Sequence, residues 1–167
     1  GLIFKAAGND GTQTADYMCG RTDIVSVAAL DTNGCKADFS TYGTWVDISA
    51  PGTGIVSSYH YHADAANDYV ATLDGTSMAT PLTASVAALI WSKNPTWTAA
   101  QVKTQLFASA DTISTLSCNS SYAGRLGSGR VNAFRAVNTG TPCAVTANFT
   151  GTPVTGCAPL NVSFTDA

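Results

Sequence analysis

A serine stands at the predicted start of a long apolar helix, in the stretch Asp74-Gly75-Thr76-Ser77-Met78-Ala79-Thr80-Pro81. The first backbone N–H groups of a helix have no intrahelical partner, and the helix dipole favours negative charge there. An alkoxide or an oxyanion would therefore be stabilised beside Ser77. Pro81 is expected in the first turn, where its missing N–H would have no partner. The simpler interpretation is a core helix capped by Ser or Thr.

A second polar residue follows another short apolar run. Residues 2–7 predict a buried parallel strand, and Gly8-Asn9-Asp10-Gly11 predicts a turn at its C-terminal end. Functional side chains cluster at such strand ends in open α/β sheets. Without further context, Asn9 is a turn residue.

Both stretches match one known family. Gly75-Thr76-Ser77-Met78-Ala79-Thr80-Pro81 resembles the nucleophile motif of the subtilisin-like serine proteases, and Ala6-Ala7-Gly8-Asn9 resembles their segment whose Asn donates to the oxyanion. Residues 37–43, 46–52 and 127–133 resemble further blocks of that family, in the family's order. The resemblance implies that Ser77 is the nucleophile and that Asn9 and the Ser77 N–H form the oxyanion hole. It also implies an α/β fold, a subtilisin-like arrangement of three layers around a mostly parallel sheet, present here in part.

The resemblance also assigns substrate and cation contacts. Ala6, Ala7, Gly8 and Thr76 would bind substrate, and the small uncharged wall formed by the first three indicates a broad apolar preference. Asp47 aligns with a weak cation site of some relatives, so a structural calcium ion is considered there, although catalysis requires no cofactor. The alternative for Asp47 is a solvated turn residue.

The base of a catalytic triad is not recognisable in this chain. His60 and His62 lie in a loop without an orienting carboxylate motif, and neither matches the Gly-Thr-His block of the family. We expect them to be exposed loop residues or substrate contacts, with the triad Asp and His upstream of this chain. The full-length protein would then be a secreted serine endopeptidase, and this chain alone would be nearly inert.

Two alternatives remain open. A sedolisin-type acid serine peptidase shares the Gly-Thr-Ser motif and the fold, but uses carboxylates as the base and to stabilise the oxyanion. Asn9 stands where that family would have Asp, which argues against this alternative. The second alternative is a non-catalytic extracellular binding protein with a decayed peptidase domain. The presence of both Ser77 and Asn9 argues against decay.

Composition limits the partners and the location of the protein. Of 167 residues, 11% are charged and 45% are hydrophobic, and the rest are largely Thr, Ser, Gly and Asn, which is common in secreted, extracellular proteins. A net charge of −3 gives no reason to expect nucleic acid, and no apolar stretch reaches the ~20 residues of a membrane-spanning helix. The chain begins and ends in strand-like sequence without an initiating Met, so we expect a piece of a longer protein. The predicted partners are protein or peptide substrates.

The cysteine spacing fits disulfides better than a zinc site or a nucleophilic thiol, so at least one disulfide is expected in a compartment outside the cytosol. A Cys19–Cys35 bond would require the chain to fold back around the strand predicted at 23–30. Near the C-terminus, Cys143 and Cys157 could form a bond, or Cys118 could anchor that segment. The five cysteines are Cys19, Cys35, Cys118, Cys143 and Cys157.

The chain divides into a larger and a smaller part. Residues 1–138 are predicted as the C-terminal portion of the peptidase domain, with helices at 76–92 and 99–109, the second opened by a Thr98–Gln101 capping box. Residues 139–144 are predicted as a linker. Residues 145–167 resemble the truncated start of a PKD-type β-sandwich domain, with strands at 145–150 and 160–165, and such a tail would contact a polymer or another protein.

Overall fold

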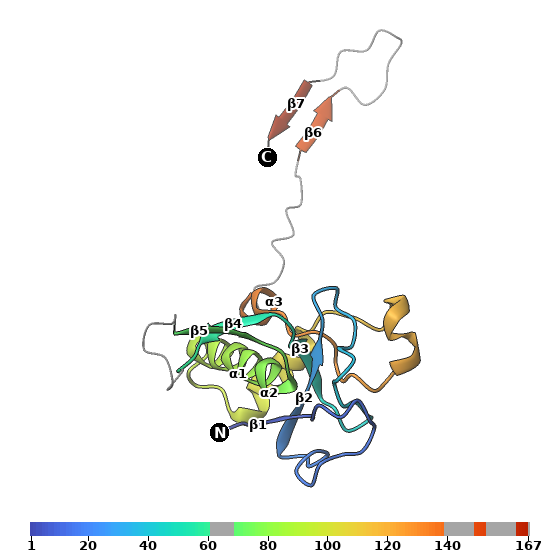
Figure 1. Ribbon diagram of the computed structural model, residues 1–167. Helices are drawn as coiled ribbons and strands as arrows, with labels where there is room; N and C mark the ends of the chain where they lie inside the picture. The colour runs from blue at the N-terminus through green and yellow to red at the C-terminus, as the bar shows by residue number, and fades with distance from the viewer. Residues whose placement is uncertain (61–68, 139–148, 153–162, 167) are drawn as a thin grey trace.

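The computed structural model describes residues 1–60, 69–138, 149–152 and 163–166. Three strands form a parallel sheet in the order β1-β2-β3, namely β1 (Ile3–Ala6), β2 (Ile24–Leu30) and β3 (Ile48–Pro51) (Figure 1). β2 is buried along its whole length. Its continuous run of β-branched and small apolar residues is typical of a strand covered on both faces. The predicted parallel sheet is therefore present.

Helices cover one face of this sheet. α1 (Thr76–Lys93) packs against all three strands, and α2 (Ala99–Ala108) and α3 (Ala133–Val137) pack against α1. Side chains from the sheet and the helices form one core; among them are Val27, Ile48, Ile90, Val102 and Leu106.

The other face of the sheet is covered by irregular segments and by the 3₁₀ helix η1 (Ser117–Tyr122). A second apolar cluster lies there, built from Ala28 and Leu30 of β2 together with Val46, Ile113 and Leu126. The sheet thus lies between a helical layer and a mostly irregular layer.

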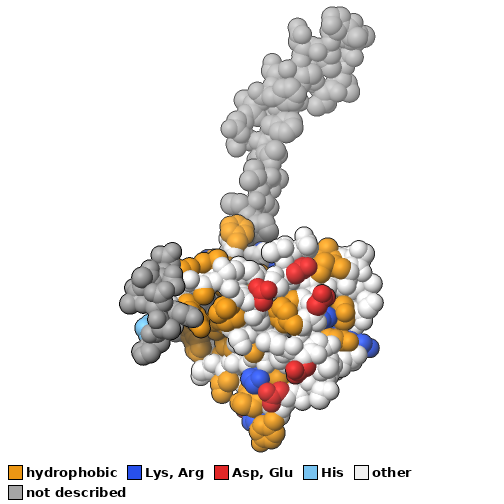
Figure 2. Space-filling model, viewed as in Figure 1, with side chains coloured by type: hydrophobic (Ala, Val, Ile, Leu, Met, Phe, Trp, Pro, Cys, Tyr) orange, Lys and Arg blue, Asp and Glu red, His pale blue; other side chains and the backbone are white. Residues whose placement is uncertain are grey.

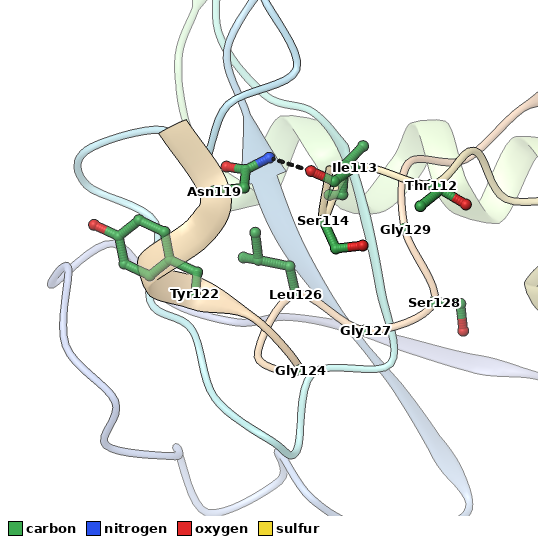
Figure 3. A pocket seen from close by; sticks show the side chains of 10 residues that line it. All are labelled: Thr112, Ile113, Ser114, Asn119, Tyr122, Gly124, Leu126, Gly127, Ser128 and Gly129. Carbon is green, nitrogen blue, oxygen red and sulfur yellow. Dashed lines mark hydrogen bonds between the residues drawn. The ribbon is translucent and has the colours of Figure 1, made fainter. Parts of the chain in front are cut away.

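A small cavity of about 50 Å³ lies in this irregular layer (Figure 3). Asn119 and Tyr122 of η1 line it, together with Leu126 and the glycine turn 127–129. Asn119 is buried and donates from Nδ2 to the carbonyls of Gly34 and Ile113. The cavity has room for a few water molecules, not for a peptide, and none of the predicted site residues lines it.

The two long helices lie close to their predicted bounds. In α2 the Thr98 hydroxyl accepts from Gln101 N–H and the Gln101 side chain accepts from Thr98 N–H, so the predicted capping box is confirmed. The prediction for Pro81 is wrong, because it lies inside α1, in the second turn. The helix begins at Thr76, directly after Gly75, so Pro81 withholds the N–H that would bond to the Ser77 carbonyl.

Two antiparallel pairs complete the described chain. β4 (Ile55–Ser58) pairs with β5 (Val70–Leu73), and Figure 2 shows hydrophobic side chains gathered over this hairpin. β6 (Phe149–Thr152) pairs with β7 (Ser163–Asp166). β6 and β7 overlap the strands predicted at 145–150 and 160–165, and the earlier residues of both predicted strands lie outside the described residues. The linker predicted at 139–144 lies outside the described residues.

A disulfide joins Cys35, which follows β2, to Cys118 in η1. Cys19 is free and buried, with its Sγ 3.8 Å from the Ala6 carbonyl oxygen, so the Cys19–Cys35 pairing considered above does not form. β2 separates those two residues by seven residues of extended chain, roughly 20 Å, and the chain does not fold back around it. Cys143 and Cys157 lie outside the described residues.

Asp111, which follows α2, binds α3 and the residues just before it. Its carboxylate accepts from Asn132 Nδ2 at 2.9 Å and pairs with Arg130 at 3.1 Å and Arg135 at 3.3 Å. The hydrogen bond from Asn132, followed by those from the two arginines, holds the pKa of Asp111 below its usual value. Backbone bonds between Asp111 and Arg130 run in both directions beside this cluster.

Candidate active site

Ser77 lies in the first turn of α1 and is exposed. The residue before the helix is Gly75, which has no side chain to cap it. The alternative of a helix capped by its own Ser or Thr hydroxyl is therefore not what the structure contains. Within the described part of the chain, the Ser77 hydroxyl has no hydrogen-bond partner.

Asn9 reaches this helix start from the end of β1. Its Oδ1 accepts from the Thr76 backbone N–H at 3.0 Å and from the Thr76 hydroxyl at 2.8 Å. Because a backbone N–H can only donate, the atom that faces it must be the amide oxygen. The Nδ2 group of Asn9 is thereby turned away from Thr76, and it has no partner among the described residues.

The first-turn amides of α1 can be accounted for one by one. Thr76 N–H donates to Asn9, and the N–H groups of Met78 and Ala79 donate to the Gly75 carbonyl at 3.0 and 3.3 Å. Among these first four helical amides, only that of Ser77 lacks an acceptor within the described residues. A free N–H at a helix start is the arrangement that binds anions.

The two free donors lie close to the same position. A Cβ built on Gly75 would lie 3.5 Å from Asn9 Nδ2, 3.5 Å from Met78 Sδ and 3.6 Å from Ser77 N. Gly75 has φ 155° and ψ 158°, a conformation that is essentially restricted to glycine. Because Gly75 has no side chain, no Cβ occupies the position beside the two donor nitrogens.

The predicted substrate residues differ in their exposure. Ala6 and Gly8 are partly exposed, whereas the Ala7 side chain is 1% exposed and packs in the second apolar cluster. Thr76 is also 1% exposed, and its hydroxyl accepts from Gly8 N–H at 3.3 Å while donating to Asn9. Ala7 therefore contributes packing, and Thr76 contacts the residues predicted to form the site.

The described histidine lies at the far end of the β4–β5 hairpin. The first pair of this hairpin, Ile55 with Leu73, lies next to the segment that leads to Ser77, whereas His60 follows the last pair, Ser58 with Val70. The His60 ring is stacked on Tyr69, with ring centroids 6.2 Å apart. This exposed placement agrees with the expectation for His60, while His62 lies outside the described residues.

Asp47 is engaged by the protein backbone. Its Oδ2 accepts from Ser26 N–H at 2.8 Å, and its carbonyl accepts from Ser128 N–H at 2.9 Å. No group of three or more His, Cys, Asp or Glu side chains that could hold a metal ion is found in the described ranges. Asp47 therefore ties the start of β3 to its neighbours, and its role at a cation site formed with loop carbonyls stays a prediction.

One contact was missed by reasoning from the sequence. The Thr76 hydroxyl links Gly8 to Asn9, so it joins the strand-end segment to the helix start. Both segments carry motifs that are visible in the sequence. Their meeting through this hydroxyl depends on tertiary packing, and the only signal in the sequence was the position of Thr76 inside the nucleophile motif.

The fold and this geometry define a class: an α/β protein with a serine at a helix start, next to the carboxyl end of a parallel strand. The chain belongs to the subtilase family, whose model matches residues 2–135.

Individual relatives agree with this assignment. The chain is 42% identical over 135 residues to a thermostable alkaline protease of Halalkalibacterium halodurans, a match that covers 81% of this chain and 34% of that protein. It is 38% identical over 132 residues to subtilisin BL of Lederbergia lenta, covering 79% of this chain and 44% of that protein. The chain thus spans less than half the length of these relatives.

Solved structures share the fold. A protease from Pseudoalteromonas arctica matches with a TM-score of 0.69 and 32% identity, over 81% of this chain and 42% of that one. The prenylagaramide maturation protease PagA matches with a TM-score of 0.63 and 31% identity, over 81% of this chain and 49% of that one. The subtilisin-like α/β fold with a parallel sheet is therefore confirmed for this chain.

Proposed function

We propose that the protein to which this chain belongs is a secreted serine endopeptidase, with Ser77 as its nucleophile and Asn9 and the Ser77 N–H as its oxyanion donors. One observation carries the proposal: Asn9 Nδ2 and Ser77 N are both without partners in the described part of the chain, and both lie close to the position that a Gly75 side chain would occupy.

In the proposed reaction, Ser77 Oγ attacks the carbonyl carbon of the scissile peptide bond. The carbonyl oxygen gains negative charge as the tetrahedral intermediate forms, and the two free N–H donors stabilise it. The start of α1 adds the positive end of the helix dipole. Asn9 Oδ1 is held by Thr76 during this step, so the donor end of the amide needs no reorientation.

Ser77 needs a base to accept its proton, because an ordinary Ser hydroxyl is a weak nucleophile. We propose that the base and its orienting carboxylate are a His and an Asp upstream of the present residues. The described chain places no histidine ring beside Ser77, and the relatives are more than twice as long as the segment matched here. This chain alone is expected to be inactive.

The proposed substrates are proteins or peptides with uncharged residues before the cleaved bond. Ala6 and Gly8 offer a small uncharged surface beside Asn9, and Thr76 positions that surface through Gly8 N–H. No cofactor is required for this chemistry. A structural calcium ion, as some subtilases bind, would use Asp47 Oδ1, since Oδ2 accepts from Ser26 N–H and Oδ1 has no hydrogen-bond partner in the described part of the chain.

Extracellular location is proposed from the low charge density, the disulfide and the names of the relatives, which include alkaline proteases. Within the described residues, no helix is long and apolar enough to cross a bilayer. The division into a peptidase portion at 1–138, a linker at 139–144 and a PKD-like portion at 145–167 also remains a proposal. The antiparallel pairing of β6 and β7 supports a β-module there, with a polymer or protein as its partner.

Turnover of a peptide substrate at neutral to alkaline pH tests this proposal in the full-length protein. Ser77→Ala should abolish hydrolysis. Ser85→Ala is the matched control, because Ser85 is exposed on the same helix two turns further on. Activity that survives in the Ser77→Ala variant would overturn the assignment of the nucleophile.

A further inference from the structure

The turn at residues 52–54 forms hydrogen bonds with Asp74 and Gly75, the two residues that precede α1. Gly75 N–H donates to the Gly52 carbonyl at 2.7 Å, and Gly54 N–H donates to Asp74 Oδ1 at 2.6 Å. The two bonds continue the β4–β5 pairing beyond its first pair, Ile55 with Leu73. The second bond uses a side-chain acceptor, so it depends on the identity of residue 74.

The turn at residues 52–54 is itself fixed to the parallel sheet through Gly52. A Cβ on Gly52 would lie 2.5 Å from the Cβ of Ala29 in β2 and 2.9 Å from the Gly75 carbonyl oxygen. Gly52 N–H also donates to the Leu30 carbonyl at 2.9 Å. The turn therefore holds Gly75 at a fixed position relative to β2.

Gly75 in turn determines where α1 begins. Its carbonyl accepts from Met78 and Ala79, and its backbone places Ser77 N–H beside the position that a Gly75 side chain would occupy. Asn9, at the end of β1, accepts from Thr76, the residue between Gly75 and Ser77. The segment that carries Ser77 N–H is thus attached at two places, to Asn9 and to residues 52–54.

We infer that Asp74 is a positioning residue for the acyl-transfer site, acting through Gly54 to hold the Gly75–Ser77 segment in register with Asn9. The inference rests on the proposed function. Asp74 is exposed, and its bond to Gly54 is a charge-assisted hydrogen bond, roughly twice as strong as a neutral one. The requirement is for an acceptor at this position, which an Asn side chain also provides.

Three variants of the full-length protein test the role of Asp74. Asp74→Ala removes the acceptor, Asp74→Asn retains it without the charge, and Asp23→Ala removes a carboxylate whose partner is the exposed Arg21. Misplacement of reacting groups by about 1 Å can cost a hundredfold in rate, so we expect kcat of Asp74→Ala to fall about tenfold to a hundredfold with little change in KM. Asp74→Asn should stay within about twofold of the parent, and Asp23→Ala should match the parent.

Amide hydrogen exchange gives a second readout that does not depend on turnover. Gly54 N–H should exchange faster in Asp74→Ala than in the parent and keep its protection in Asp74→Asn. Unchanged kcat and unchanged Gly54 protection in Asp74→Ala would overturn the inference, and so would an Asp74→Asn variant as slow as Asp74→Ala. Failure of the proposed function is seen separately, as hydrolysis that persists in Ser77→Ala.

Discussion

The Asn9 amide oxygen caps the helix that carries Ser77, by accepting from Thr76 N–H at 3.0 Å. One side chain therefore has two ends with different tasks: its oxygen satisfies the first amide of α1, and its nitrogen stays free to donate. Helix capping usually comes from the residue just before the helix. Here the cap comes from a segment 67 residues earlier in the chain and joins the strand end to the helix start.

Asn9→Asp separates the two ends of this side chain. A carboxylate still accepts from Thr76 and is favoured at a helix start, so the melting temperature should be unchanged or higher. The donor is replaced by an oxygen that repels the oxyanion, so kcat should fall about a hundred- to a thousandfold, the loss typical of one oxyanion donor. Thermal melting measures the first effect, and steady-state kinetics with active-site titration in the full-length protein measures the second.

Asn9→Ala is the companion variant, because it removes the cap and the donor together. It should lose kcat to a similar extent and also unfold at a lower temperature, since Thr76 N–H and the buried Thr76 hydroxyl lose their acceptor. Near-normal turnover per titrated site in either variant would contradict the oxyanion assignment.

Thr76→Val tests the hydroxyl that bridges Gly8 and Asn9. The substitution preserves volume but leaves Gly8 N–H and one bond of Asn9 unmatched, at a cost of about 1–3 kcal/mol in the free energy of unfolding. With Asn9 less firmly held, kcat should fall while KM changes little. Thr76→Ser keeps the hydroxyl and should retain most of the activity, and equal losses in Thr76→Ser and Thr76→Val would argue against the bridging role.

The Cys35–Cys118 bond should appear in non-reducing peptide maps of the full-length protein as one linked pair of peptides. Cys19 should be alkylated only after denaturation, because it is free and buried. The bond closes a separation of 83 residues, so Cys35→Ser should lower the free energy of unfolding by about 2–5 kcal/mol. Free thiols at both positions in oxidised material would refute the pairing.

The Asp111 cluster predicts a defined acid sensitivity. The pKa of Asp111 is lowered in the folded state, first by the hydrogen bond from Asn132, so its stabilising contribution is complete above its unfolded value near 3.8. The contribution is lost as the pH falls through the pKa of Asp111 in the folded protein. Thermal melting of Asp111→Asn should therefore depend less on pH below about pH 4 than melting of the parent.

Asp23→Asn serves as the control for Asp111→Asn. Its ion pair with Arg21 is exposed, and exposed pairs contribute little to stability. If the melting temperature of Asp111→Asn depends on pH below about pH 4 in the same way as that of the parent, the Asp111 cluster does not determine the loss of stability in acid.

Local patterns in the sequence predicted the elements that carry the site. The helix predicted at 76–92 ends one residue before α1 does, and the capping box predicts the start of α2 correctly. Each of these predictions depends only on residues that are close together in the sequence. The contacts of Asn9 were not predictable, since they require β1 and α1 to pack together. The same holds for the Cys35–Cys118 pairing, which depends on η1 lying against the loop after β2.

The wrong prediction for Pro81 has a local cause. A helix that begins at Thr76, as predicted, has Pro81 as its sixth residue, so Pro81 falls in the second turn. Gly75 adopts a conformation that other residues avoid, and it lies beside Gly52 and Asn9, which are distant from it in the sequence. Sequence patterns within α1 alone do not contain this information.

The central claim is that Ser77 is a nucleophile served by the donors of Asn9 and its own backbone. A peptidyl phosphonate reacts with such a serine and leaves an oxygen in the position of the oxyanion, so mass spectrometry of the labelled full-length protein tests the claim directly. The predicted result is one adduct, located on Ser77, formed in step with the loss of activity and much more slowly in Asn9→Asp. An unlabelled Ser77 in folded protein, with hydrolysis unaffected by the reagent, would contradict the claim.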